Sequence, residues 1–138
     1  MDYHYKFSIQ LRVRYGETDQ MGYCYYGNYA EYLEVGRVES LRALGMSYRS
    51  LEENNIMLPV AEFTIKYHSP AKYDDLLTIT TQITRITAAR IFFDYTITNE
   101  EGKIICTAQT TLVFVDKENK KPIQAPEEFL HLIAPYAF

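Results

Sequence analysis

The sequence predicts an α+β fold in which a five-stranded antiparallel sheet wraps around one long helix. Two observations favour this fold. Residues 29–44 repeat apolar side chains at helical spacing, whereas five other segments alternate apolar and polar residues with a period of two. One of these segments precedes the long helix and four follow it, which is not a repeated strand–helix–strand pattern. We therefore expect a single domain over residues 1–138.

The first element is predicted to be a strand over residues 7–15. Its odd-numbered residues are apolar or aromatic and alternate with polar side chains: Phe7, Ile9, Leu11, Val13 and Tyr15. Successive side chains of a strand point to opposite faces of the sheet, so this alternation is typical of a strand with one buried face.

The long helix is predicted over residues 29–44. Asn28 is placed to cap its start, and Glu31 three residues later completes the pattern of a capping box. Gly45 is placed to end the helix. Gly36, inside the helix, costs about 1 kcal/mol relative to alanine. We attribute Gly36 to close packing of the helix against the sheet.

A short second helix is predicted over residues 47–54, with Ser47 as its cap. The four later strands are expected to run on as a meander, with the last two joined by the turn at 100–103, and a short helix is expected near the C-terminus. The four strands are predicted over residues 56–69 (interrupted by Pro59), 76–87, 89–99 and 103–116, and the helix over residues 127–133. A sheet of this kind has open edges that need protection or a partner, so we expect copies of the chain to associate edge-to-edge or face-to-face.

Composition excludes several classes of function. The net charge is −4 and no run of Lys or Arg could follow a phosphate backbone, which argues against nucleic-acid binding. Cys24 and Cys106 have no metal-type spacing, so we expect no metal and two reduced thiols in a cytoplasmic protein. The N-terminus lacks the pattern of a signal peptide, and no apolar run approaches the ~20 residues of a membrane span.

The segment YGETDQMGYCYYGNY, residues 15–29, places two carboxylates, three glycines and five tyrosines just before the long helix. With the order of elements, it resembles the hotdog fold and the 4-hydroxybenzoyl-CoA thioesterase superfamily, in its YbgC-type acyl-CoA thioesterase branch. The matching residues are Tyr15, Glu17-Thr18-Asp19, Gly22, Tyr25, Asn28-Tyr29, Glu34, Arg37 and the segment 67–79.

The resemblance implies an acyl-CoA thioester hydrolase with Asp19 as its catalytic carboxylate. An aspartate is charged at neutral pH, so Asp19 could attack the thioester carbonyl or take a proton from water, and the sequence leaves both routes open. The resemblance assigns the backbone N–H of Tyr26 as the oxyanion donor. Many members of the family carry a histidine at this position, and a tyrosine, with a pKa of about 10, cannot replace it as a base near pH 7.

The resemblance also suggests residues that bind the substrate. Gly22 and Gly27 would permit a tight turn and close approach of a ligand, and the tyrosines would wall the acyl channel. The expected binding residues are Gly22, Tyr25, Gly27, Asn28, Tyr29, Glu34, Lys66 and Arg90, with Lys72 and Arg85 as further candidates for the coenzyme A phosphates. These basic groups are expected to come from a neighbouring subunit, and each could instead be a plain surface charge.

Each of these residues also has a plain structural interpretation. Asp19 could close an Asx turn, Glu17 could be a structural partner, Cys24 could be a small buried apolar group and the tyrosines could serve packing alone. Glu34 and Arg37 could form a weak surface pair or support the site.

The expected partners are an acyl-CoA substrate and a second copy of the chain, in a homodimer or homotetramer, with no cofactor beyond the coenzyme A of the substrate. A non-catalytic acyl-thioester binder or regulator is the alternative function. A hotdog dehydratase is less well supported, because that chemistry normally uses a histidine that this loop lacks. The sequence does not determine the length or the aromatic character of the acyl group.

Overall fold

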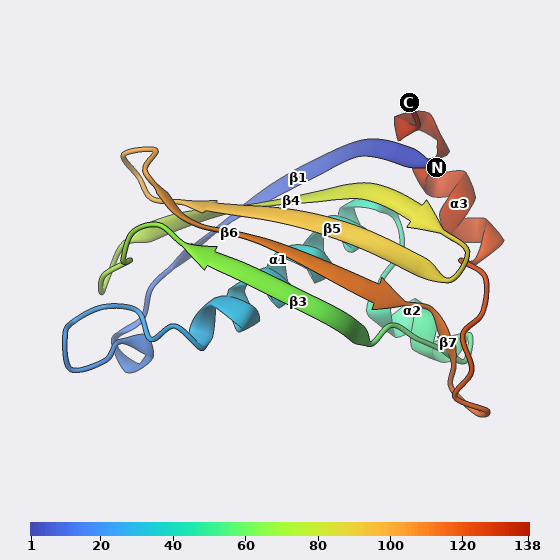
Figure 1. Ribbon diagram of the computed structural model, residues 1–138, viewed down its shortest axis with the longest axis horizontal. Coiled ribbons are helices and arrows are strands. Elements are labelled where there is room, and N and C mark those ends of the chain that lie inside the picture. The colour runs from blue at the N-terminus through green and yellow to red at the C-terminus, as the bar shows by residue number, and fades with distance from the viewer.

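The computed structural model describes residues 1–138 and has the predicted α+β architecture, a five-stranded antiparallel sheet curved around one long helix (Figure 1). The sheet contains β1 (Asp2–Arg12), β3 (Val60–Tyr67), β4 (Leu76–Thr87), β5 (Arg90–Thr98) and β6 (Ile104–Val113). The helices are α1 (Asn28–Leu44), α2 (Tyr48–Glu53) and α3 (Glu127–Ile133). Two short strands, β2 (Ile56–Met57) and β7 (Val115–Asp116), pair with each other, and two 3-10 turns are η1 (Tyr15–Glu17) and η2 (Ala134–Tyr136).

The strand order is β1-β4-β5-β6-β3, so the prediction of a four-strand meander is wrong for β3. Strand β3 pairs with β6 at one edge, and β4 pairs with β1 at the other. Strands β1 and β4 have 11 and 12 residues and match in length, whereas β3 has eight mostly exposed residues, as an edge strand does. Alternation in the sequence shows which face of a strand is buried and not which strand lies beside it.

The first strand and the long helix begin or end at other residues than predicted. Strand β1 begins at Asp2 because Tyr3 and Tyr5 continue the buried positions, and it ends at Arg12. The capping prediction for α1 is wrong: the helix begins at Asn28, Gly27 is its N-cap and no side chain caps it. The prediction for α2 is confirmed, since the Ser47 side chain accepts the Ser50 N–H at 3.0 Å.

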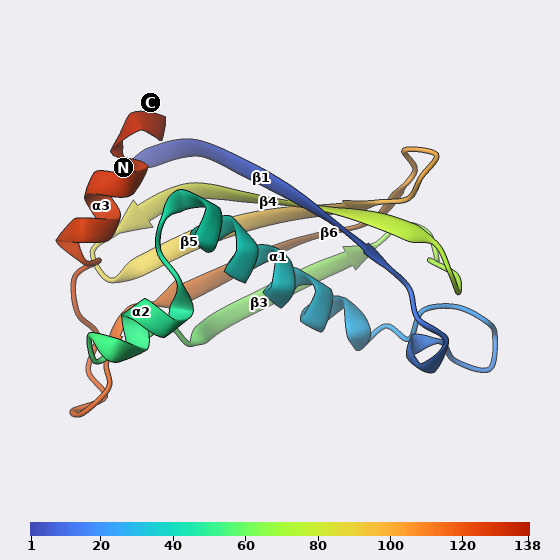
Figure 2. The same ribbon diagram turned by 180° about the vertical axis from the view of Figure 1, so that it is seen from behind.

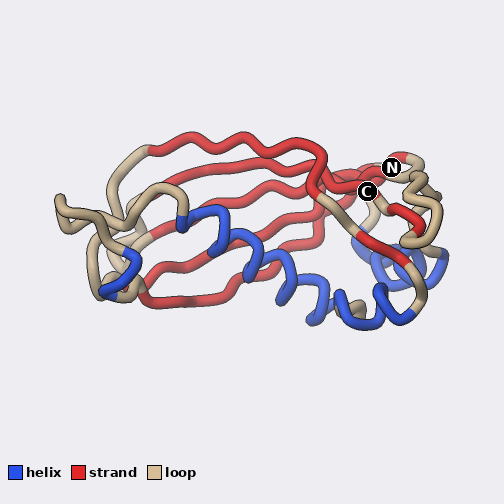
Figure 3. The backbone as a smooth tube through the Cα atoms, turned by 90° about the horizontal axis from the view of Figure 1, so that it is seen from below, coloured by secondary structure: helices blue, strands red, loops and turns tan.

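Helix α1 crosses one face of the sheet, and no helix covers the middle of the opposite face (Figure 3). At the crossing, a Cβ added to Gly36 would lie 2.7 Å from Ile79 Cγ2 and 2.8 Å from Thr81 Oγ1. This confirms that Gly36 permits close packing. Gly45 has a φ of 112° and ends the helix as predicted.

The two ends of α1 face different surroundings (Figure 2). The loop that follows β1 lies at the N-terminal end of α1, while α2, α3 and both chain termini lie toward the other end. No helix of the chain combines the length and apolar character that are needed to cross a membrane. The fold therefore presents the acid- and glycine-containing loop at the start of the long helix.

Candidate functional site

The loop between β1 and α1 folds as a small hairpin. The Asp19 N–H donates to the Tyr23 carbonyl at 2.8 Å, and the Tyr25 N–H donates to the Glu17 carbonyl at 2.8 Å. Gly22, at the tip, has a φ of 79°, a left-handed conformation that glycine adopts without strain. The hairpin thus links Asp19 through a short hydrogen-bonded ladder to the residues that begin α1.

The Asp19 carboxylate is half-buried and fixed through one oxygen. Its Oδ1 accepts the Met21 N–H at 2.9 Å and the Tyr23 N–H at 3.2 Å, so the side chain closes an Asx turn. Its Oδ2 accepts no hydrogen bond and forms no ion pair. The structural interpretation of Asp19 therefore holds, and it leaves one carboxylate oxygen available for chemistry.

Two backbone N–H groups are unpaired where α1 begins. The N–H groups of Tyr26 and Gly27 donate to no acceptor, although the neighbouring Tyr25 and Asn28 N–H groups do. Unpaired N–H groups at a helix start carry a partial positive charge and bind anions. One loop therefore carries both a carboxylate oxygen without a partner, on Asp19, and an unpaired backbone N–H, on Tyr26.

Glu17 is a structural partner, as its plain interpretation predicted. Its carboxylate accepts the Arg14 Nη2 at 2.8 Å, the Arg14 N–H at 2.9 Å and the Tyr32 hydroxyl at 2.8 Å. The Arg14 guanidinium lowers the pKa of Glu17 below its usual value, and the Tyr32 hydroxyl adds to that effect. The Asn28 side chain donates to the Glu17 carbonyl at 2.7 Å and so fastens the helix start to the loop.

Cys24 and Tyr29 pack in the core beneath the loop. Burial raises the pKa of the Cys24 thiol, so it is a poor nucleophile, as expected for a small buried group. Ala71 is the shared partner of these residues: its carbonyl accepts the Cys24 N–H at 2.8 Å, and its N–H donates to the Tyr29 hydroxyl at 3.3 Å. The Tyr29 ring is 3% exposed, so this structure gives it a packing role.

Three exposed tyrosines line the start of α1. The rings of Tyr25 and Tyr26 lie 4.8 Å apart, and the Tyr26 ring meets the edge of Tyr67 at 6.4 Å. Tyr67 begins the segment 67–79 that matches the family, but it was not among the expected binding residues because it lies at the end of β3, far from the loop in the sequence. Together the three rings form an aromatic wall beside the unpaired amides.

Glu34 and Arg37 do not form a surface ion pair. Arg37 is 6% exposed and donates through Nε to the Tyr48 hydroxyl at 2.9 Å and through Nη1 to the Tyr95 hydroxyl at 3.0 Å. Glu34 lies on the exposed side of α1. Arg37 thus joins α1 to α2 and β5, which places it in the scaffold of the fold.

The four basic candidates lie in different places. Lys72 lies in the loop before β4, where its backbone bridges to Tyr23 of the hairpin. Lys66 is next to Tyr67 on β3, and successive strand side chains point to opposite faces, so Lys66 is directed away from the aromatic wall.

Arg85 and Arg90 lie at the other end of the sheet. Asp2 pairs with Arg85, and Arg12 at the end of β1 leads into the hairpin. Asp2 and Arg12 are ten residues apart along β1. At 3.3 Å per residue, Arg85 therefore lies about 33 Å from the end of β1 that leads into the hairpin. A role for Arg85 or Arg90 in binding therefore requires another copy of the chain, and the binding roles of all four residues stay predictions.

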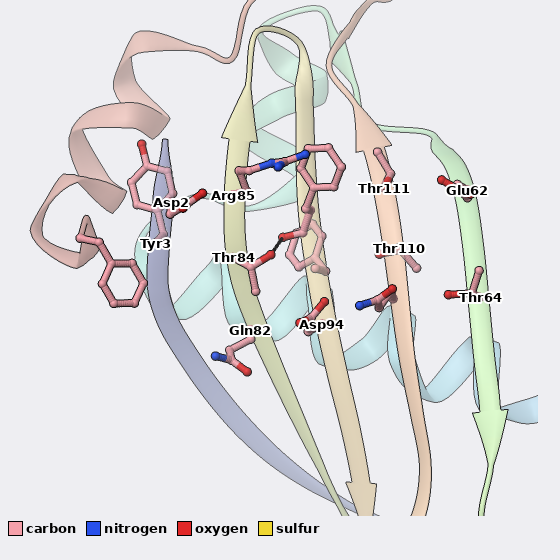
Figure 4. Close-up of a pocket in the computed structure, with 14 residues that line it drawn as sticks. Asp2, Tyr3, Glu62, Thr64, Gln82, Thr84, Arg85, Asp94, Thr110 and Thr111 are labelled. Carbon is pink, nitrogen blue, oxygen red and sulfur yellow. Dashed lines mark hydrogen bonds between the residues drawn. The ribbon is translucent and has the colours of Figure 1, made fainter.

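A cavity of about 540 Å³ lies on the outer face of the sheet, away from α1 (Figure 4). Its lining is mainly polar and includes Gln82, Thr84 and Asp94. None of the loop residues 15–29 borders it. It is therefore a surface separate from Asp19, and we place the candidate site at the loop because the reactive groups gather there.

Comparisons with known proteins identify the family of the chain. A family model described as the thioesterase-like superfamily matches residues 13–133. The chain belongs to this superfamily. It is 35% identical over 120 residues to YneP of Bacillus subtilis, covering 87% of each chain. It is 32% identical over 124 residues to the acyl-CoA thioester hydrolase YbgC of Escherichia coli O6:H1, covering 90% of this chain and 92% of that one.

A solved structure confirms the fold. The DHNA-CoA thioesterase of Staphylococcus aureus superposes with a TM-score of 0.89 at 28% identity and covers 94% of this chain and 89% of that one. The predicted hotdog fold and the resemblance to the YbgC-type branch are thus confirmed. The protein is a thioester hydrolase by these relationships.

Proposed function

We propose that the protein hydrolyses acyl-CoA thioesters to a free carboxylic acid and coenzyme A. One observation supports this most directly: unpaired N–H groups at Tyr26 and Gly27 share a loop with a carboxylate oxygen of Asp19 that has no partner. The named thioesterases among its relatives agree with this substrate class.

In the proposed reaction, the thioester carbonyl oxygen accepts the Tyr26 N–H, and the amide stabilises the oxyanion as it forms. The free oxygen of Asp19 then acts in one of two ways. It attacks the carbonyl carbon and expels the coenzyme A thiolate, leaving a mixed anhydride that water cleaves, or it takes a proton from the water that attacks. Both routes consume one water molecule and release the thiol and the acid.

The remaining loop groups would hold these atoms in place. The two amides on Oδ1 restrain rotation of the Asp19 carboxylate, so its second oxygen keeps one direction. Tyr25, Tyr26 and Tyr67 would flank the acyl group. We propose that no metal or cofactor takes part, because a carboxylate and backbone amides supply the groups that both routes require. The two free cysteines fit a reducing compartment, and we propose the cytoplasm.

Thiol release from short, long and aromatic acyl-CoAs tests the proposal. We expect Asp19→Asn to lower kcat by about 10²–10⁴-fold, the usual contribution of a catalytic acid or base, while the variant keeps its fold. Asp2→Asn, an exposed carboxylate at the far end of β1, is the matched control and should keep the wild-type rate. Retained turnover in Asp19→Asn would contradict the role of Asp19. Binding without thiol release by the wild type would favour the non-catalytic alternative.

We also propose that a second copy of the chain pairs along β3. One side of this strand pairs with β6 and the other is open, and its side chains Val60, Phe63 and Tyr67 are 48%, 41% and 48% exposed. An unprotected edge of eight residues with apolar side chains favours pairing with another strand. Such a dimer would cover the aromatic wall at Tyr67 and could supply basic groups from the second copy. The mass of the protein in solution distinguishes such a dimer from a tetramer of two dimers.

A further inference from the structure

Two exposed tyrosines beside the hairpin have no role in the proposed reaction. Tyr15 is 79% exposed and Tyr73 is 55% exposed. Their ring centroids lie 5.7 Å apart with the planes at 83°, an edge-to-face pair that leaves ring faces open to solvent. Scattered single apolar residues are common on surfaces, but two large aromatic rings held against each other offer open ring faces on which a flat ligand can stack.

Both tyrosines are attached to the backbone around Asp19. The Tyr15 carbonyl accepts the Thr18 N–H at 3.2 Å and the Thr18 Oγ1 at 2.8 Å, and Thr18 directly precedes Asp19. Tyr73 adjoins the segment that bridges to Tyr23, whose carbonyl accepts the Asp19 N–H. The tyrosine pair therefore lies on the rim of the candidate site.

The two segments that carry the pair are held together. The Val13 N–H donates to the Asp75 carbonyl at 2.9 Å, and the Asp74 N–H donates to the Val13 carbonyl at 2.9 Å. Arg12 adds a side-chain hydrogen bond to the Asp74 carbonyl at 2.7 Å. Because these hydrogen bonds hold the two backbone segments against each other, the two tyrosines start from a fixed relative position and binding orders few groups.

The charges around the pair are nearly balanced. Glu17 and Asp74 each face a neighbouring arginine, and the Asp75 carboxylate accepts the Lys72 N–H at 2.8 Å. The Lys72 ammonium forms no ion pair, so it is the one cation beside the pair that is free to meet a phosphate. Stacking on the rings, more than charge, must therefore supply the affinity of this surface.

We propose that Tyr15 and Tyr73 bind the adenine ring of the coenzyme A part of the substrate. This inference rests on the proposed function, which supplies an adenine nucleotide at the same rim. A purine ring can stack on the face of one tyrosine while the other tyrosine borders its edge, and Lys72 lies next to Tyr73 for a phosphate.

Calorimetric titration with adenosine 3′,5′-bisphosphate, the nucleotide half of coenzyme A, tests the site without any reaction. Replacing a stacking aromatic residue by alanine weakens binding of a base by about 5- to 150-fold. We expect losses in this range for Tyr15→Ala and for Tyr73→Ala, and a dissociation constant within about twofold of wild type for Tyr15→Phe, which keeps the ring. Phe138→Ala removes an aromatic ring that is 85% exposed at the chain terminus, and it should bind like wild type.

Measuring KM and kcat with two substrates, one with and one without the nucleotide, shows whether the loss of affinity in Tyr15→Ala comes from contacts with the nucleotide. For acyl-CoA, Tyr15→Ala should raise KM by a similar factor with kcat unchanged. For the matching acyl-pantetheine, which lacks the nucleotide, KM should be the same in the variant and the wild type.

Three results would overturn the inference: no binding of the nucleotide by the wild type, equal binding by Tyr15→Ala, or an equal rise in KM for both substrates. A change of oligomeric state in Tyr15→Ala would show that the pair is a subunit contact, and would also overturn it. If no acyl-CoA is cleaved at all, the proposed function fails, and the titration still decides whether the tyrosines bind the nucleotide.

Discussion

Replacing Gly36 by alanine should lower stability even though alanine favours a helix. The new Cβ would lie 2.7 Å from Ile79 Cγ2 and 2.8 Å from Thr81 Oγ1, shorter than carbon or oxygen atoms tolerate, and both residues are fully buried in the sheet. Overpacking of this kind costs about 1–3 kcal/mol, and the better helix propensity returns about 1 kcal/mol. The expected net loss is about 1 kcal/mol, within a range of about 0–2.

Urea unfolding of the wild type and Gly36→Ala measures this difference. Exchanging Ala43 on the exposed side of α1 for glycine gives the helix-propensity effect alone, and it should cost about 1 kcal/mol. Thr81→Ala removes one of the two close atoms, so Gly36→Ala should cost less in that background. Greater stability in Gly36→Ala than in the wild type would refute the close-packing argument.

Other predictions follow from single contacts. Ser47→Ala should lower the free energy of unfolding by about 1 kcal/mol because α2 loses its cap, and urea unfolding would show it. Because the pKa of Glu17 is lowered in the folded protein, its contribution to stability is complete above the usual glutamate pKa and is lost as pH falls through the folded-state pKa. Glu17→Gln should therefore lose less stability in acid than the wild type does. Parallel curves of unfolding free energy against pH for the two proteins would contradict this. Burial raises the pKa of Cys24 and raises that of Cys106 to about 12. Neither thiol should therefore react with iodoacetamide at pH 8 until the chain unfolds. Mass spectrometry would detect labelling of the folded protein, which would contradict this. Phe63→Lys should shift the sedimentation of the protein toward the monomer, and an unchanged sedimentation coefficient would count against pairing along β3.

The fold was predictable from the sequence because local patterns determine it. The alternation in β4 and β5 predicted both strands to within two residues at either end, since one face of each is buried along its whole length. Gly36 and Gly45 had the roles that their positions in the helix indicated. The position of β3 was not predictable, because pairing depends on contacts between residues about 50 positions apart, such as Val60 with Leu112.

The candidate site was predictable in part. Asp19 and the amide of Tyr26 lie in one loop, so the sequence placed both in one candidate site without knowledge of the fold. Asn28 showed the limit of this reasoning: its side chain binds the Glu17 carbonyl in place of capping the helix, and such a contact depends on how the loop folds back. Tyr67 reaches the site only because the sheet brings β3 beside the helix start.

The strand order also has a consequence for synthesis of the chain. Strand β3 pairs only with β6, whose partner residues begin about 40 positions later, and β1 pairs with β4 across as many as 83 positions, from Asp2 to Arg85. Because the ribosome adds about 5–20 residues per second, β1, α1 and β3 emerge seconds before their neighbours exist. The nascent chain must therefore keep two unpaired strands apart until β4 to β6 have been made, and during this interval their open edges are exposed to aggregation and to chaperones.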